Sequence, residues 1–282
     1  MQISKENTPK VSVCMITYGH EKYIREAIEG VLMQECDFEV ELIVANDCSP
    51  DNTDAVIQDI IKNHPRGSWI KYFHHKENLG IGNNFKFALQ ECSGDYISIC
   101  EGDDFWINSR KLQIQIDFLD SNQDYIIHSG NAIFKSSNST TKGRKVINAS
   151  EKKIFQLDDF LVNNNLCTCT STFRNTKICF PENFQKVTFK DWYLYVILLQ
   201  ESGKQVYRTA EVYSTYRIHG GGVMKSLSSK NYFQAHIFQI KVIREQLKFK
   251  KLMRSSKIVA ESYFFELYKI TLGEKSYLEA FS

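Results

Sequence analysis

The stretch DYISICEGDDFW, residues 95–106, runs from an apolar, strand-forming segment straight into a cluster of acids. The carboxylates of Glu101, Asp103 and Asp104 fall within four positions, and two aromatic residues follow. Like charges at the end of an apolar strand cost free energy unless a positive group lies among them. A hard cation such as Mg²⁺ or Mn²⁺ binds one or two such carboxylates and fills its remaining positions with water and ligand oxygens. The stretch therefore favours a strand that ends in a divalent-cation site, with a solvated acidic turn as the alternative.

Upstream of this stretch, strand-like and helical patterns alternate. We expect strands at residues 11–17, 39–46, 69–75 and 95–100, and helices at residues 20–34, 49–64 and 81–94. In the second of these helices, Ser49 is the expected N-cap and Pro50 lies in the expected first turn. Strands that alternate with helices form parallel sheets, so the fold class is α/β, with helices on both faces of the sheet.

Downstream of the acids the pattern is less regular. A helix at 111–119 and a strand at 124–134 are expected first, followed by a polar loop at 135–145. Beyond the loop we expect a helix at 154–164, a strand at 166–174, a helix at 191–203, one or two strands at 205–219 and amphipathic helices from about residue 230. Cys167 and Cys169 are expected to be ordinary strand residues.

The composition excludes several classes of protein. With 282 residues, 43% of them hydrophobic, and a net charge of +2, the chain can bury a core and offers no whole-chain charge for nucleic acid. Its eight cysteines include no CxxC pair, which favours reduced thiols over disulfides or a zinc site. The start of the chain lacks the apolar core of a signal peptide, and no apolar run approaches the ~18 residues of a spanning helix. We therefore expect a cytoplasmic protein, or one at the cytosolic face of a membrane.

The turns that follow the strands carry the chemistry, since open α/β sheets bind ligands beyond the carboxyl ends of their strands. The first turn, TYGHEKY (17–23), has neither the GxGxxG of a dinucleotide site nor the GxxxxGK[ST] of a P-loop. A bound diphosphate would therefore need a cation to neutralise it. Asn46 and Asp47 end the second strand, and acids end the fourth. These groups suit a ligand that has hydroxyl and imide donors and brings its phosphates to a divalent cation.

Four segments, in order, resemble the family 2 glycosyltransferases, which have the GT-A fold. They are VSVCMITYGHEKYIREAIEGVLMQ (11–34), ELIVANDCSPDNT (41–53), NLGIGNNFKFALQECSGDYISICEGDDFW (78–106) and KDWYLYVILLQESGKQVYRTAEVYSTYRIHGGGV (190–223). The resemblance implies a Rossmann-like, mostly parallel sheet with helices on both faces. It also implies a GT-A domain over residues 1–225, with a nucleotide-binding half at about 1–134, an acceptor half at about 150–225 and a helical C-terminal extension at 226–282.

The resemblance also implies which residues bind the donor. The nucleotide would lie over Thr17 and Tyr18, with Asp47 facing the uracil or another base. Glu101 stands at the first acid of the family's DxD motif, near the ribose, and Asp103 stands at the last acid, as the metal ligand. The other expected donor contacts are Asn84, Gly102, Arg217 and His219. His219 would also reach the metal, an Mn²⁺ or Mg²⁺ ion, whereas Asp104 is a weaker candidate ligand.

Asp191 stands where the family has its catalytic base. Its alternative role is the N-cap of the helix that follows it, and His219 has an alternative role as a structural histidine before the glycine-rich turn 220–222. Departures from the family pattern, such as Asn46 and Cys48 after the second strand, leave the base and the sugar of the donor open.

The implied reaction is inverting, metal-dependent transfer of a sugar from a nucleotide-diphosphate donor such as a UDP-sugar. The acceptor would be a hydroxyl of a saccharide or lipid-linked saccharide in cell-surface polysaccharide synthesis. Two other functions stay open: a nucleotidyltransferase, which would need a basic, glycine-rich first turn, and a non-catalytic protein that binds sugar nucleotides. The basic and apolar C-terminal segment predicts peripheral contact with an anionic membrane or, alternatively, packing on the domain or a homodimer interface.

Overall fold

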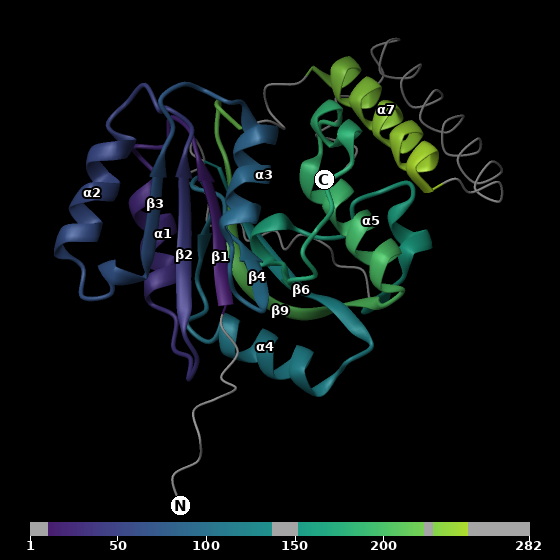
Figure 1. The fold of residues 1–282 in the computed structure, drawn as a ribbon, viewed down its shortest axis with the longest axis horizontal. Coiled ribbons are helices and arrows are strands. Elements are labelled where there is room, and N and C mark those ends of the chain that lie inside the picture. Colours follow the sequence, from purple (N-terminus) through teal and green to yellow (C-terminus); the bar gives the residue numbers. More distant parts are fainter. Residues whose placement is uncertain (1–10, 137–151, 223–227, 248–282) are drawn as a thin grey trace, which may run out of the picture.

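The computed structural model describes residues 11–136, 152–222 and 228–247. Within these residues, nine strands form one sheet in the order β3-β2-β1-β4-β8-β6-β9-β5, and β7 pairs with β9. The strands are β1 (Val11–Thr17), β2 (Val40–Asn46), β3 (Ile70–His74), β4 (Tyr96–Ile99), β5 (Phe105–Trp106), β6 (Tyr125–Ser136), β7 (Ile154–Phe155), β8 (Thr172–Arg174) and β9 (Gln205–Ile218). The α-helices are α1 (Ile24–Leu32), α2 (Thr53–Asn63), α3 (Ile81–Glu91), α4 (Lys111–Ser121), α5 (Lys190–Ser202) and α7 (Ser229–Leu247), and Figure 1 shows their arrangement.

The strands β1 to β4 form the predicted parallel half of the sheet. β1 runs parallel to β2 on one side and to β4 on the other, and β3 continues the parallel order beyond β2. Every residue of β1 and β2 is buried, as expected for central strands with helices on both faces. The register pairs Thr17 with Asn46, so the two strands end at the same level. The turns that follow them therefore meet at one edge of the sheet.

Helices cover both faces of this half of the sheet, which confirms the predicted α/β class. On one face, α1, α2 and α4 pack over side chains such as Val13 and Met15 of β1. On the other face, α3, α5 and α7 belong to a cluster that includes Cys14 and Ile16 of the same strand. Alternate residues of one strand thus serve two hydrophobic cores, because successive side chains point to opposite faces.

The second half of the sheet departs from the parallel pattern. β8 pairs antiparallel with both β4 and β6, whereas β6 and β9 run parallel. β9 also pairs antiparallel with the two-residue strand β5, with Phe105 opposite Thr215 and Trp106 opposite Ser214. Since β5 directly follows the acidic cluster in the chain, this pairing brings the end of β9 to the acids.

The helix α2 begins later than the sequence predicts. Its N-cap residue is Asn52, so the prediction that Ser49 caps it is wrong. The Ser49 hydroxyl instead donates to Asn46 Oδ1 at 2.6 Å, and the Ser49 backbone N–H donates to the same oxygen at 3.1 Å. Cys48 adopts a left-handed φ of 58°. These bonds and this backbone conformation form a turn that delays the helix.

The prediction of a helix at residues 154–164 is wrong. Ile154–Phe155 forms the strand β7, and Leu157–Phe160 forms only a short 3₁₀ helix. A capping box between Gln156 and Asp159 fixes the start of this turn.

The predicted strand at 166–174 is also wrong over most of its length, since only Thr172–Arg174 is extended in the sheet. Thr168–Thr170 forms a 3₁₀ turn that includes Cys169. The hydroxyls of Thr170 and Ser171 donate to the Cys167 carbonyl at 2.8 and 3.2 Å. Such side chain–backbone bonds compete with the sheet ladder and explain the turn.

The helix α7 packs on the domain beside α5 (Figure 1). The Gln239 side chain both donates to the Phe189 carbonyl at 2.8 Å and accepts the Phe189 N–H at 3.0 Å, and Ile240 and Ile243 are buried in the core. Within the described ranges, no helix combines the length and the apolar character needed to cross a membrane. The basic residues that motivate the predicted membrane contact, Lys248, Lys250, Lys251 and Arg254, lie outside the described residues.

Candidate functional site

Three side chains with metal-ligating atoms converge at the carboxyl edge of β1 and β4. They are Asp103 from the turn after β4, His219 from the end of β9 and His20 from the turn after β1, and their ligand atoms all lie within 4.8 Å of one another. His219 Nε2 is 2.9 Å from Asp103 Oδ2, and His20 Nε2 is 4.0 Å from the same oxygen. The sequence predicts Asp103 and His219 as ligands but misses His20, whose only signal is its place in the first turn.

The turn after β1 holds His20 through both its backbone and its ring. The backbone N–H donates to Thr53 Oγ1 at 2.9 Å, and Thr17 Oγ1 lies 3.1 Å from the ring atom Nδ1. Gly102 makes room for this contact, because a Cβ at that position would lie 2.8 Å from Thr17 Oγ1 and 3.1 Å from His20 Nδ1. The predicted site residues Thr17 and Gly102 thus orient the His20 ring with Nε2 toward Asp103.

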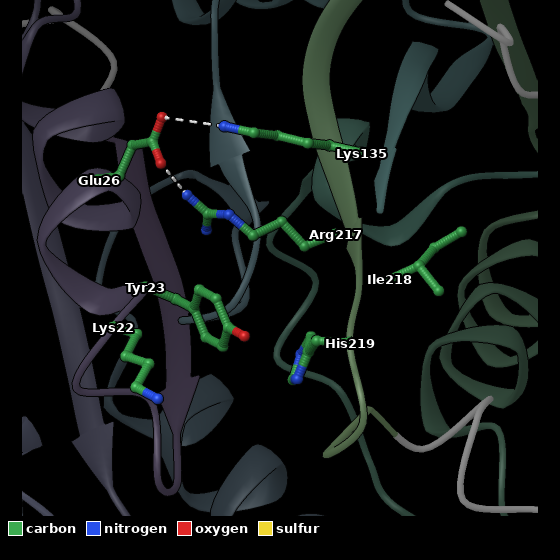
Figure 2. Close-up of a pocket in the computed structure, with 7 residues that line it drawn as sticks. All are labelled: Lys22, Tyr23, Glu26, Lys135, Arg217, Ile218 and His219. Carbon is green, nitrogen blue, oxygen red and sulfur yellow. Dashed lines mark hydrogen bonds and ion pairs between the residues drawn. The ribbon is translucent and has the colours of Figure 1, made fainter. Parts of the chain in front are cut away.

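Tyr23 and Arg217 contact the cluster at His219 and Asp103. In Figure 2 the Tyr23 ring faces His219, and the ring centroids are 4.7 Å apart. Arg217 Nη1 donates to the Asp103 carbonyl oxygen at 2.6 Å, and the Arg217 backbone N–H donates to Asp104 Oδ1 at 2.8 Å. The guanidinium also pairs with Glu26 of α1. Arg217 therefore joins the acidic turn, β9 and α1 into one unit.

Two pockets open against His219. The first has a volume of about 210 Å³ and is lined by Lys22, Tyr23, Glu26, Lys135, Arg217, Ile218 and His219 (Figure 2). The second, of about 290 Å³, shares Lys22, Tyr23 and His219 with the first and also includes Gly19, Glu21, Asp51, Gly220 and Gly221. Tyr18, which is 48% exposed, directly follows β1 and precedes Gly19 and His20 in the same turn. A ligand can therefore reach the cluster from solvent.

The pKa values of the acids in the EGDD turn shift in opposite directions. Burial raises the pKa of Glu101 and that of Asp104 well above the usual range, and the charge of Asp103 adds to the shift in both. Burial acts on Asp103 in the same direction, but the hydrogen bond with His219 and the charges of His219 and His20 outweigh it and lower the pKa of Asp103. Among the acids of this turn, Asp103 is therefore the one whose surroundings favour the charged carboxylate.

Asp104 lies outside this group of ligands. Its side chain is buried, and Oδ2 has no hydrogen-bond partner among the residues that the structure describes. Its Oδ1 accepts the Arg217 N–H, so Asp104 anchors β9 beside the cluster.

Asp191 lies in the first turn of α5, and the N-cap residue of that helix is Phe189, so the alternative role of Asp191 as the N-cap is wrong. Asp191 Oδ2 accepts hydrogen bonds from Asn164 Nδ2 at 2.7 Å and from Thr168 Oγ1 at 2.6 Å. Burial raises the pKa of Asp191, and the charge of Asp191 contributes to the raised pKa of Glu101. The carboxylate is thus held in a fixed orientation within electrostatic reach of the acidic turn.

Asp47 and Asn84, which the sequence predicts as donor contacts, make structural bonds. Asp47 is buried, and its Oδ1 accepts the Leu79 N–H at 2.7 Å. Asn84 Nδ2 donates to the Ala45 carbonyl at 3.0 Å. Asp47, directly after β2, therefore binds the segment that leads into α3, and Asn84 ties α3 itself to β2. The contacts of both side chains with a donor stay predictions.

Comparison with known sequences places the chain in a family. The sequence model of Glycosyl transferase family 2 matches residues 12–177. Over 264 residues the chain is 27% identical to an uncharacterised glycosyltransferase of Haemophilus influenzae, a match that covers 93% of this chain and 96% of the relative. Over 220 residues it is 29% identical to an uncharacterised protein of Mycobacterium tuberculosis, covering 77% of this chain and 61% of that relative's length.

Comparison with solved structures confirms the predicted GT-A fold. S. aureus TarS (residues 1–349) in complex with UDP-GlcNAc superposes with a TM-score of 0.65 at 20% identity, covering 90% of this chain and 71% of that chain. The mannosyltransferase PcManGT from Pyrobaculum calidifontis, in complex with GDP-Man and Mn²⁺, gives a TM-score of 0.58 at 13% identity, covering 98% and 79%. At these identities the likeness establishes the fold alone. Because the family model matches more than half of the sequence, this chain belongs to glycosyl transferase family 2.

Proposed function

We propose that this protein is an inverting, metal-dependent glycosyltransferase. It transfers a sugar, a hexose or N-acetylhexosamine, from a nucleotide-diphosphate donor. The favoured donor is a UDP-sugar. The acceptor is a hydroxyl of a saccharide or lipid-linked saccharide in cell-surface polysaccharide synthesis. Family membership supports this proposal, as do neighbours in fold that bind UDP-GlcNAc or GDP-Man with Mn²⁺.

One observation carries the proposal: the β5–β9 pairing brings His219 next to Asp103 at the edge where α/β sheets bind ligands. A charged carboxylate and imidazole nitrogens within 4.8 Å of one another fit a divalent cation, so Asp103 and His219 would hold it. When bound, such a cation neutralises the charge that develops on the departing diphosphate.

Asp191 is the proposed general base. It would accept the proton of the acceptor hydroxyl as that oxygen attacks the anomeric carbon from the side opposite the diphosphate. Burial raises the pKa of Asp191 and so makes its carboxylate more basic, while the bonds from Asn164 and Thr168 fix its direction. A single attack of this kind inverts the anomeric centre, so an α-linked donor gives a β-linkage.

The test begins with a thermal-shift screen of nucleotide sugars in the presence of Mn²⁺. A donor at about 100 times its Kd should stabilise the fold by roughly 2.7 kcal/mol. Release of the nucleoside diphosphate from the best donor is then measured with and without saccharide acceptors and with EDTA. We expect release to rise with an acceptor and to stop with EDTA.

Two other results would identify the rival functions. Donor binding without release under any condition would indicate a non-catalytic sugar-nucleotide-binding protein. Release of pyrophosphate from a nucleoside triphosphate and a sugar phosphate would indicate a nucleotidyltransferase.

A further inference from the structure

We propose that His20 is a third protein ligand of the metal site, and that the resulting set of two imidazoles and one carboxylate selects Mn²⁺ over Mg²⁺. This inference rests on the proposed metal-dependent transfer and specifies the site that performs it. It concerns a residue that sequence patterns did not mark as a ligand.

The first step is the geometry around Asp103 Oδ2. Two ligands about 2.1 Å from one ion and at right angles lie about 3.0 Å apart, whereas opposite ligands lie about 4.2 Å apart. The distance from His219 Nε2 to the oxygen is 2.9 Å, and that from His20 Nε2 is 4.0 Å. Both imidazoles therefore present Nε2 to the same carboxylate oxygen within the range of one coordination sphere.

The second step is the support of the His20 ring. A metal-bound imidazole needs its other nitrogen bonded to an oxygen, which fixes the ring and its tautomer. His20 Nδ1 has this partner in Thr17 Oγ1 at 3.1 Å, which leaves Nε2 for the ion. The His20 carbonyl accepts the N–H groups of Tyr23 and Ile24 at 2.9 and 2.8 Å, so the residue is anchored at the start of α1. The ring is therefore prepared for coordination by the same turn that begins the helix.

The third step is burial. The side chains of His20 and His219 are only 16% and 7% exposed, and that of Asp103 is 22% exposed. Because so little water reaches the two imidazoles and the carboxylate, an ion that coordinates all three would stabilise them most. The competing interpretation is a hydrogen-bonded cluster that only joins β9 to the turns after β1 and β4, and the experiment below separates the two.

The fourth step is ligand chemistry. Mg²⁺ prefers oxygen ligands and keeps most of its water, whereas imidazole binds first-row transition ions with an affinity that rises from Mn²⁺, the weakest of the series, through Co²⁺. With one nitrogen ligand the site would resemble an ordinary phosphate-linked Mg²⁺ or Mn²⁺ site. With two nitrogens from His20 and His219, the site should favour Mn²⁺, and Co²⁺ or Zn²⁺ still more, over Mg²⁺.

The test titrates the metal-free full chain with MnCl₂ and follows the free Mn²⁺ by electron paramagnetic resonance, with no nucleotide present. Replacing His20 by Ala or by Gln should weaken Mn²⁺ binding by at least roughly 10- to 100-fold. This is the loss in metal affinity typical when only the hydrogen-bond partner of a ligand is removed. His64→Gln is the matched control, because His64 Nδ1 accepts the Arg66 N–H at the far end of α2 and lies outside the cluster. Thermal melting establishes that each variant is folded.

A competition arm measures selectivity. The wild type should keep Mn²⁺ in an excess of MgCl₂ of roughly 100-fold, and His20→Asp should narrow this preference because an oxygen replaces a nitrogen. Unchanged Mn²⁺ affinity in both folded His20 variants, or displacement of Mn²⁺ by equimolar Mg²⁺, would overturn the inference. A separate result, equal binding of UDP with Mn²⁺ and with EDTA, would overturn the proposed metal-dependent function itself.

Discussion

His219 Nε2 lies 2.9 Å from Asp103 Oδ2, although 116 positions separate the two residues in the chain. The short strand β5 makes this contact possible, because it begins two residues after Asp103 and pairs with β9, which ends just before His219. Arg217 reinforces it with bonds to the backbone of Asp103 and the carboxylate of Asp104. The candidate site is therefore a product of strand pairing, and substitutions at a few positions can test it.

Asp103→Asn should make donor binding independent of the metal. The substitution removes the one acid of the turn whose pKa is lowered, and with it the proposed negative ligand of the cation. Calorimetry of UDP binding should give the same affinity for this variant in Mn²⁺ as the wild type shows in EDTA. Asp104→Asn is the control and should keep its response to EDTA, since burial raises the pKa of Asp104 and the residue lies outside the ligand cluster.

Asp191→Asn should slow transfer by roughly 10²- to 10⁴-fold, the usual contribution of a positioned general base. Asn can still accept the bond from Thr168, so the start of α5 and the donor affinity should change little. Initial rates at saturating donor and acceptor measure the loss of transfer, and a donor titration measures the donor affinity. Asp158→Asn, in the nearby 3₁₀ turn, is measured alongside because Asp158 is a rival candidate for the base, and we expect it to keep the wild-type rate. Transfer by Asp191→Asn at the wild-type rate would move the search for the base to Asp158, Asp159 and Glu182.

Gly102→Ala should weaken Mn²⁺ binding at least tenfold and destabilise the fold by about 1–3 kcal/mol. The new Cβ would lie 2.8 Å from Thr17 Cβ and Oγ1, so the Thr17–His20 contact must move. Gly220→Ala is the matched control, because nothing lies within 4 Å of a Cβ at that position. Free Mn²⁺ and melting temperature are the two readouts, and equal values for the two alanine variants would contradict the expected role of Gly102.

Glu41→Gln should lower stability at neutral pH and matter less in acid. Burial would raise the pKa of Glu41, but hydrogen bonds from Lys71, Ser12 and Ser93 outweigh it and lower the pKa to about 2 from the usual 4.5. A lowered pKa in the folded state means that Glu41 contributes stability above pH 4.5 and loses that contribution as the pH falls toward 2.

Urea unfolding of Glu41→Gln and wild type at pH 7 and pH 3 measures this contribution, on the order of 2 kcal/mol at neutral pH. The exposed neighbour Glu39 supplies the control Glu39→Gln. A difference between wild type and Glu41→Gln that is as large at pH 3 as at pH 7 would refute the linkage.

The parallel half of the fold could be predicted from the sequence because its signals are local. Continuous apolar runs mark β1 and β2, and helical spacing marks the segments between the strands. The acids of the EGDD turn could also be assigned to a strand end, and the resemblance to the family added Asp191 and His219. The helix at 154–164 and the strand at 166–171 were wrongly predicted, and at 168–171 hydroxyl–backbone bonds such as that from Thr170 to Cys167 override the strand pattern.

The sequence by itself thus determined the α/β class, the edge of the sheet that carries the candidate site and the acidic turn at that edge. Only the tertiary structure decided that His20 joins Asp103 and His219 in one cluster. A two-residue strand such as β5 has no pattern of its own and exists because β9 pairs with it. The position of a side chain across such a pairing depends on the register of distant strands, which is fixed by the packing of the whole sheet and not by the propensities of neighbouring residues.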